Sequence, residues 1–234
     1  MDPLVHRITV VGVGGTGCAL LPLLVGLGPI QLTLVDGDTV EATNLPRQPL
    51  FGPADTGRVK VEVAAERMQA IAPHVRVTTV PRFLDATNAQ DLVQASTIVL
   101  DATDDLHAKH LLDRTCRAHR VPLITGSVHG HQIQVVALHV GSGSTGIGLG
   151  DLFSGRSSPE QDACDMRAVP VHITALCASV MAMHARALVL GDHSLAGHVD
   201  LIDPRTGRWL RIAAPVAPHD DELIAQGTSS TLRT

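Results

Sequence analysis

A chain of 234 residues that is 44% hydrophobic and 18% charged has ample material for the buried core of one large α/β domain. Its formal net charge of −5 and its two lysines, Lys60 and Lys109, argue against the phosphate backbone of nucleic acid as a main partner. None of the four cysteines forms a C-x-x-C pair and no signal-peptide pattern is recognised before the first predicted strand, so we expect a cytoplasmic location.

The first predicted element is a β-branched apolar strand at residues 8–13, which runs into glycines and then into an apolar helix at residues 18–25. The glycines of the turn are Gly12, Gly14, Gly15 and Gly17. Strand, glycine-rich turn and helix together form a phosphate cradle, because glycine lets the backbone approach phosphates and the helix N-terminus presents free N–H groups. A second strand, residues 31–35, ends at Asp36, which is placed to accept a hydrogen bond from a ribose hydroxyl.

A polar segment follows at residues 37–48, and the prolines and glycines of residues 46–57 indicate an irregular loop. Helical periodicity resumes at residues 59–71 with Lys60 near its start. A cation is not favoured at a helix N-terminus by the helix dipole. We therefore expect Lys60 either to be solvated or to point at an anion.

Strands and helices then alternate with short links, which predicts a doubly wound, Rossmann-like, mostly parallel α/β sheet with a mixed or antiparallel C-terminal edge. Strands are predicted at residues 75–80, 97–100, 122–126 and 132–139, the last at an edge of the sheet. Helices are predicted at residues 85–95, capped by Asp85 or Thr87, and at residues 107–120.

A flexible crossover loop is predicted at about residues 141–165, followed by an apolar helix at residues 169–190. Charged and histidine side chains in that helix favour a core or subunit-interface position over a membrane span. A hairpin of residues 198–203 and 209–213 ends the predicted single domain, residues 1–214, and a frayed tail is expected at residues 215–234.

A glycine turn with a downstream acid is weak evidence by itself, since nicotinamide and flavin enzymes share it. The specific signal is a set of motifs in order along residues 8–213, and with it the chain resembles the ThiF/MoeB/HesA family, the prokaryotic relatives of ubiquitin-activating enzymes. The motifs are Gly12-Val13-Gly14-Gly15-Thr16-Gly17, Asp36-Gly37-Asp38-Thr39-Val40, Thr43-Asn44-Leu45-Pro46-Arg47-Gln48, Lys60 and Asp101-Ala102-Thr103-Asp104-Asp105.

The resemblance implies an adenylyltransferase that binds ATP and Mg²⁺ and the Gly-Gly C-terminus of a small ubiquitin-like or sulfur-carrier protein. The tail carboxylate would attack the α-phosphate, giving an acyl-adenylate and pyrophosphate. By position in the motifs, Gly15 would lie in the phosphate loop, Asp36 would hold the ribose, and Asp104 would organise the magnesium. Asn44, Arg47 and Lys60 would contact the phosphates. Most relatives are homodimers, which the resemblance also implies here.

The proposed chemistry requires cations, because a carboxylate attacking phosphorus brings negative charges together. Arg47 offers a fork for two phosphate oxygens and Lys60 a mobile point charge. Asp104 would follow a strand's carboxyl end, although either it or Asp105 could instead cap the next helix. Two further alternatives stay open. Asp38 either assists the nucleotide or fixes the loop, and Thr43 either contacts the nucleotide or only its own turn.

Three departures from the family pattern bear on the activity. Many members carry an arginine on an N-terminal helix that reaches the partner's active site, and Arg7 lies too close to the first strand for that role. The paired C-x-x-C motifs of many relatives do not occur, so we expect no structural zinc at that location. His129 and His131 lie two residues apart, and we interpret them as edge-strand histidines rather than as metal ligands. Cys164 stands where relatives have a cysteine that forms covalent adducts, and it is either such a catalytic thiol or an incidental loop residue.

Three alternatives therefore accompany the adenylation hypothesis. One is a non-catalytic or partner-dependent adenylyltransferase-like subunit, and another is an NAD-dependent Rossmann oxidoreductase, which would leave Arg47, Lys60 and Asp104 without a role. The third, within the family, is activation of a small-molecule or tRNA-borne carboxylate. No membrane partner is expected.

Overall fold

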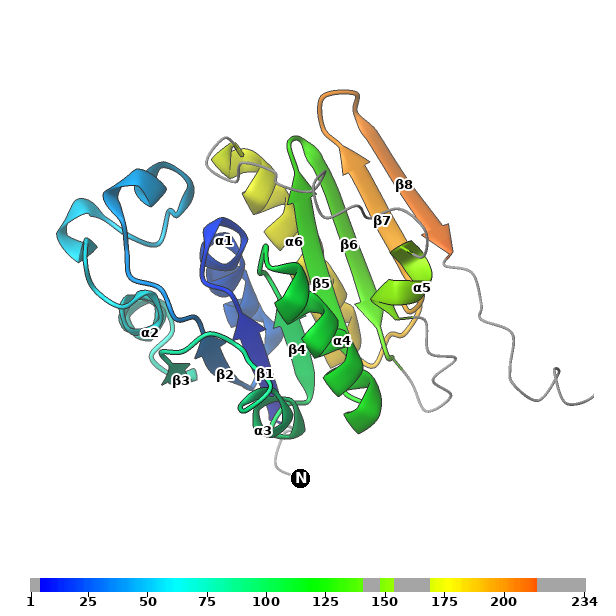
Figure 1. Ribbon diagram of the computed structural model, residues 1–234, viewed down its shortest axis with the longest axis horizontal. Helices are drawn as coiled ribbons and strands as arrows, with labels where there is room; N and C mark the ends of the chain where they lie inside the picture. The colour runs from blue at the N-terminus through cyan, green and yellow to red at the C-terminus, as the bar shows by residue number, and fades with distance from the viewer. Residues whose placement is uncertain (1–4, 141–147, 154–168, 214–234) are drawn as a thin grey trace, which may run out of the picture.

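A computed structural model describes residues 5–140, 148–153 and 169–213, and its centre is one eight-stranded sheet with the order β3-β2-β1-β4-β5-β6-β7-β8 (Figure 1). The strands are β1 (His6–Val11), β2 (Ile30–Val35), β3 (Arg76–Val80), β4 (Ile98–Asp101), β5 (Leu123–His129), β6 (Gln132–Leu138), β7 (His198–Asp203) and β8 (Arg208–Ala213). The helices are α1 (Gly15–Leu24), α2 (Lys60–Ile71), α3 (Ala89–Gln94), α4 (Leu106–His119), α5 (Leu149–Phe153) and α6 (Val171–Val189), and short 3-10 turns lie at η1 (Val25–Leu27), η2 (Ala42–Arg47) and η3 (Pro53–Asp55).

The predicted doubly wound α/β fold is confirmed. Strands β3, β2, β1, β4 and β5 are parallel neighbours, and β6, β7 and β8 continue the sheet in antiparallel pairs. The prediction that residues 132–139 form an edge strand is wrong, because the C-terminal hairpin β7–β8 pairs outside β6 and makes β8 the edge. A pairing between strands 60 residues apart leaves no trace in the local pattern of β6.

Helices cover both faces of the sheet, and each face has its own apolar core. On one face α1, α2 and α6 pack over a large cluster that includes Leu21 and Met68. On the other face α3, α4 and α5 cover a smaller cluster around Leu112 and Leu123. Because both faces are covered, consecutive residues of the central parallel strands are buried, as in residues 8–11 of β1 and all of β4, rather than alternating with exposed ones.

The long apolar helix α6 belongs to the first of these cores. By length and composition alone it could cross a membrane, with a mean hydropathy of 1.3. It packs instead on α1, β5 and β6 and buries Thr174, Met181 and His184, which fits the predicted core position. Burial lowers the pKa of His184, so its ring is neutral and its Nε2–H donates to the Asp200 carboxylate on β7 over 2.7 Å.

The helix predicted at residues 85–95 is shorter than expected and begins at Ala89. Neither Asp85 nor Thr87 caps it. The Asp85 carboxylate accepts hydrogen bonds from the backbone N–H groups of Thr87 and Asn88, and these close a separate turn ahead of α3. A short acid that bonds its own backbone two residues later favours a turn over a helix start.

Several predictions concern segments outside the described residues. These are most of the crossover loop at 141–165, including Cys164, and the tail at 215–234. The division of the chain into one domain and a tail therefore stays a prediction.

Candidate nucleotide site

The glycine turn lies where the strand order reverses, between β1 and β4, which is the position at which open α/β sheets bind ligands. Gly12 has φ of +90°, and a Cβ there would lie 2.9 Å from the carbonyl of Ala102 after β4. A Cβ on Gly17 would lie 2.1 Å from the Gly12 carbonyl oxygen. Larger side chains at these two positions would force the turn away from β4, so the glycines set the close contact between β1, α1 and β4.

A cavity of about 1300 Å³ opens above this turn. Most of the predicted site residues line it: Gly12, Gly14, Gly15, Asp36, Asp38, Asn44, Arg47, Lys60 and Asp104. Two predicted residues do not: Gly17 packs beneath the turn, and Thr43 lies outside, with its hydroxyl donating to Glu41. The structure thus brings together segments that are up to 92 residues apart in the sequence, Gly12 and Asp104.

Asp36 holds the glycine turn to the loop after β2. It is 8% exposed, and its carboxylate accepts hydrogen bonds from the backbone N–H of Val13 over 2.7 Å and of Asp38 over 2.8 Å. A carboxylate has about four acceptor positions, so two remain for a ligand hydroxyl. The ribose role of Asp36 is compatible with this geometry and stays a prediction.

Of the two alternatives for Lys60, the structure supports the one in which the lysine points at an anion. Its side chain is 5% exposed, and Nζ donates to the half-exposed Asp38 carboxylate over 2.7 Å. The backbone N–H of Lys60 donates to the Asp38 carbonyl, which ties the start of α2 to the loop after β2. Asp38 therefore places the lysine at the cavity wall and balances its charge there.

Arg47 sits at the end of η2 and is held by its own turn. Its guanidinium donates to the Asn44 side-chain oxygen and to the Thr43 carbonyl oxygen. The adjacent Gln48 is 3% exposed, lines the same cavity, and has a side-chain oxygen with no partner among the described residues. Gln48 belongs to the recognised motif, but sequence reasoning assigned it no role, because burial of its amide is not visible in the sequence.

The two acids after β4 play different parts, since only one of them caps α4. Asp105 is the N-cap of α4 and accepts from the backbone N–H of His107 over 2.9 Å. Asp104 is exposed and lines the cavity, and no described group is hydrogen-bonded to its carboxylate. An uncommitted carboxylate fits Mg²⁺, which is commonly held by one or two carboxylates together with substrate phosphates. The described residues contain no cluster of three or more metal-ligating side chains.

A buried lysine on the floor of the cavity was missed by sequence reasoning. Lys109 on α4 has a side chain that is 7% exposed, and its Nζ donates to Asp101 over 2.9 Å, to the Gly126 carbonyl over 2.9 Å and to Thr125 over 3.2 Å. These contacts fasten the carboxyl ends of β4 and β5 to α4. The only sequence signal was that the chain has just two lysines; both line this cavity.

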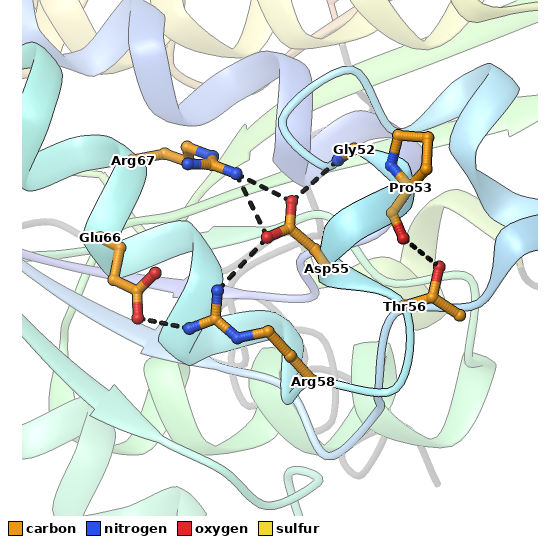
Figure 2. Close-up of polar contacts among 7 residues, drawn as sticks. All are labelled: Gly52, Pro53, Asp55, Thr56, Arg58, Glu66 and Arg67. Carbon is orange, nitrogen blue, oxygen red and sulfur yellow. Dashed lines mark hydrogen bonds and ion pairs between the residues drawn. The ribbon is translucent and has the colours of Figure 1, made fainter.

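The loop that leads to Lys60 is braced by a second charge network (Figure 2). The buried Asp55 carboxylate accepts from the backbone N–H of Gly52 over 2.9 Å and from Arg67 over 2.9 Å, and it also pairs with Arg58. The Gly52 hydrogen bond and the Arg67 guanidinium hold the pKa of Asp55 below its ordinary value. Arg67 belongs to α2, so this network fixes the loop to the helix that Lys60 begins.

Three of the cysteines are core residues. Cys18, Cys116 and Cys177 are buried and free. Burial raises the pKa of the Cys18 and Cys177 thiols to about 12 and raises that of Cys116 as well. A thiol is the unreactive form, so these three are poor nucleophiles.

The lining of the cavity extends from the glycine turn to residues of the antiparallel strands. Its far part is lined by polar residues of β5 and β6 and by residues of the β7–β8 hairpin. These include Ser127, His129, Gln134, Leu201, Asp203, Arg208 and Leu210. The cavity therefore has charged residues at the glycine turn and a mixture of polar and apolar residues at the β7–β8 hairpin.

Known proteins share this sequence pattern over long stretches. The sulfur carrier protein adenylyltransferase of Thermus thermophilus is 33% identical over 200 residues, which cover 84% of this chain and 74% of that protein. The molybdopterin-synthase adenylyltransferase of Salmonella typhimurium is 42% identical over 121 residues, 52% of this chain and 49% of that protein. The chain spans about half the length of the first curated relatives that it matches.

Solved structures share the fold. Escherichia coli MccB, crystallised with ATP, has a TM-score of 0.75 at 19% identity, covering 92% of this chain and 64% of that chain. PaaA has a TM-score of 0.71 at 24% identity, covering 89% and 64%. The model of the ThiF family matches residues 4–223, nearly the whole sequence. The chain belongs to the ThiF family.

Proposed function

We propose that the protein uses ATP to adenylate the C-terminal carboxylate of a small ubiquitin-like or sulfur-carrier protein and releases pyrophosphate. One observation carries this proposal: Arg47, Lys60 and Asp104, from three separate segments, line one cavity over the glycine turn. Membership of the ThiF family and the names of its relatives support the same activity.

The cavity residues suit the attack of a carboxylate on the α-phosphate of ATP. Arg47 and Lys60 would stabilise the negative charge that builds up between the attacking carboxylate and the phosphates. Asp104 would hold Mg²⁺, which when bound supplies charge neutralisation at the phosphates. The Lys60–Asp38 pair keeps the ammonium group in position before the nucleotide arrives, so that Lys60 needs little rearrangement to share its charge with a phosphate oxygen.

The lining of the cavity, which reaches the β7–β8 hairpin, supports a protein tail as the second substrate. A Gly-Gly C-terminus is narrow and would reach the charged end while the preceding residues lie along β5 and the β7–β8 hairpin. An extended peptide advances about 3.3 Å per residue, so several tail residues would occupy this path. A small free carboxylate would leave the hairpin end of the cavity unused.

ATP–pyrophosphate exchange tests the proposal. We expect exchange to require a Gly-Gly-tailed carrier protein, and Asp104→Ala to lower it at least 100-fold. Asp91→Ala, which removes an exposed acid on α3, is the matched control and should leave exchange unchanged. If no carrier supports exchange, or if Asp104→Ala behaves like the wild type, the catalytic proposal fails.

A partner-dependent form of the same activity is the second candidate, because Asp38 partly neutralises Lys60 and a further cation would strengthen the site. ATP binding without exchange, restored by adding a second protein, would favour it. The NAD-dependent alternative has no support from the family match and gives Arg47, Lys60 and Asp104 no role. The homodimer, the cytoplasmic location and a covalent adduct on Cys164 stay predictions.

A further inference from the structure

An exposed aromatic ring lines the cavity. The chain has only three phenylalanines and one tryptophan, and no tyrosine. Phe83, which follows β3, is 62% exposed and lines the cavity, and it is the one phenylalanine or tryptophan among the described lining residues. Because this ring is exposed rather than packed in the core, its position is not explained by the stability of the fold.

The segment that carries Phe83 is rigidly held. The Asn88 side chain donates to the Phe83 carbonyl over 2.9 Å, while the backbone N–H of Asp85 donates to the Asn88 side-chain oxygen over 3.0 Å. The backbone N–H of Asn88 in turn donates to the Asp85 carboxylate. This reciprocal pair fixes the backbone on the C-terminal side of the ring, and Arg82 bonds back to Val80 on the other side. The exposed ring is therefore presented by an ordered turn.

The position of the ring is set by a glycine between the two acids of the site. A Cβ on Gly37 would lie 2.6 Å from a ring carbon of Phe83, so the ring rests directly on the backbone of Gly37. Gly37 separates Asp36 from Asp38. The ring thus lies against the residue that directly follows Asp36, the carboxylate that is expected to hold a ribose.

We infer that Phe83 is the base-binding platform of this site, on which the adenine of ATP stacks while Asp36 holds the ribose. The inference rests on the proposed function. Every base has a π face that stacks on an aromatic ring, and Leu84 and Ala102 add apolar lining beside it. Phe83 accordingly contributes to affinity and specificity, because it would favour binding of a nucleotide over binding of a polyphosphate that has no base.

The test compares the binding of ATP and of inorganic tripolyphosphate by calorimetry. Alanine substitution of a stacking ring weakens nucleotide affinity about 5- to 150-fold, and we expect Phe83→Ala to do so for ATP while tripolyphosphate affinity is unchanged. Phe83→Trp should retain ATP affinity within about threefold. Ile71→Ala, which truncates an exposed apolar side chain on α2 away from the cavity, is the matched control and should change neither.

Gly37→Ala gives an independent check of the stacked geometry. The added methyl group would displace the ring, so ATP affinity should fall in the wild-type background and show no further fall in the Phe83→Ala background. Additive losses would overturn the inferred geometry, because they would mean that Gly37 acts without the ring.

The outcomes separate this inference from the proposed function. Wild-type protein that binds no ATP would overturn both. If Phe83→Ala binds ATP as tightly as the wild type does, the base-platform inference fails while the proposed function stands. An equal loss of tripolyphosphate affinity in Phe83→Ala would also overturn the base-platform inference, because the ring would then support the phosphate end rather than the base.

Discussion

The ammonium group of Lys109 holds together the carboxyl ends of β4 and β5 beside the cavity. Replacing Lys109 by Met keeps most of the volume of the side chain and removes the ammonium group. The Asp101 carboxylate, fully buried, would keep hydrogen bonds from Thr103 and Thr125 but would lose its only described cation. The Gly126 carbonyl would lose a donor as well.

The expected cost follows from the burial of both partners. Removing one partner of a buried ion pair leaves an uncompensated charge and destabilises a protein by about 3–5 kcal/mol. A domain has a total stability of about 5–15 kcal/mol, so we expect Lys109→Met to fold with a strongly reduced free energy of unfolding. Asp104 lies three residues after Asp101, so loosening of this strand end should also lower adenylation.

Urea unfolding of three variants measures the effect. Lys109→Met should lose about 3–5 kcal/mol, and the double variant Asp101→Asn/Lys109→Met should be more stable than Lys109→Met, because no buried charge remains. Arg82→Met, which breaks the exposed pair with Asp85, is the control and should change stability little. A loss below about 1 kcal/mol in Lys109→Met, or a double variant less stable than the single one, would refute the reasoning.

Three further predictions address charge, pH and thiol chemistry. Lys60→Met should lower the rate of ATP–pyrophosphate exchange about 10²- to 10³-fold, whereas Arg114→Ala, an exposed cation on α4, should not; equal rates would exclude Lys60 from the reaction. The pKa of His184 is lowered by burial, so the folded protein keeps the ring neutral while the unfolded chain takes up a proton below about pH 6.5. The free energy of unfolding should therefore fall as the pH drops from 7 to 5, and denaturant titrations of His184→Gln should show a shallower fall; an identical slope would contradict a neutral His184 in the fold. Iodoacetamide labelling of the native protein, read by mass spectrometry, should leave Cys18, Cys116 and Cys177 unmodified, and early modification of one of them would show that the core opens more readily than its packing implies.

Local patterns in the sequence were sufficient for most of the elements. Runs of apolar residues and the glycine turn identified β1, β2, α1 and α2 within a few residues, because strand and helix periodicity and turn chemistry depend on near neighbours. The choice of Arg47, Lys60 and Asp104 came from the family resemblance of the motifs that contain them, and all three line the cavity. The start of α3 was wrong because a local Asp85–Asn88 turn competes with helix formation.

The order of the sheet, by contrast, required long-range pairing. Whether β6 is an edge strand depends on a hairpin that begins 60 residues after its end, and such pairing is decided by burial of the combined surface rather than by β6 itself. The contacts of Lys109 with Asp101, Thr125 and Gly126 are of the same kind: no local pattern in the sequence links these residues, and only the packing of α4, β4 and β5 makes them a buried network.

The sequence by itself therefore determined the fold class, the family and most of the predicted site residues that line the cavity. The tertiary structure decided how those residues are held: Lys60 against Asp38, Asp104 left uncommitted beside the Asp105 cap, and Phe83 resting on Gly37 in the cavity lining. The physical reason is that motifs record which chemical groups are present, whereas charge pairing, burial and exposure arise only when segments distant in sequence are brought within a few ångströms.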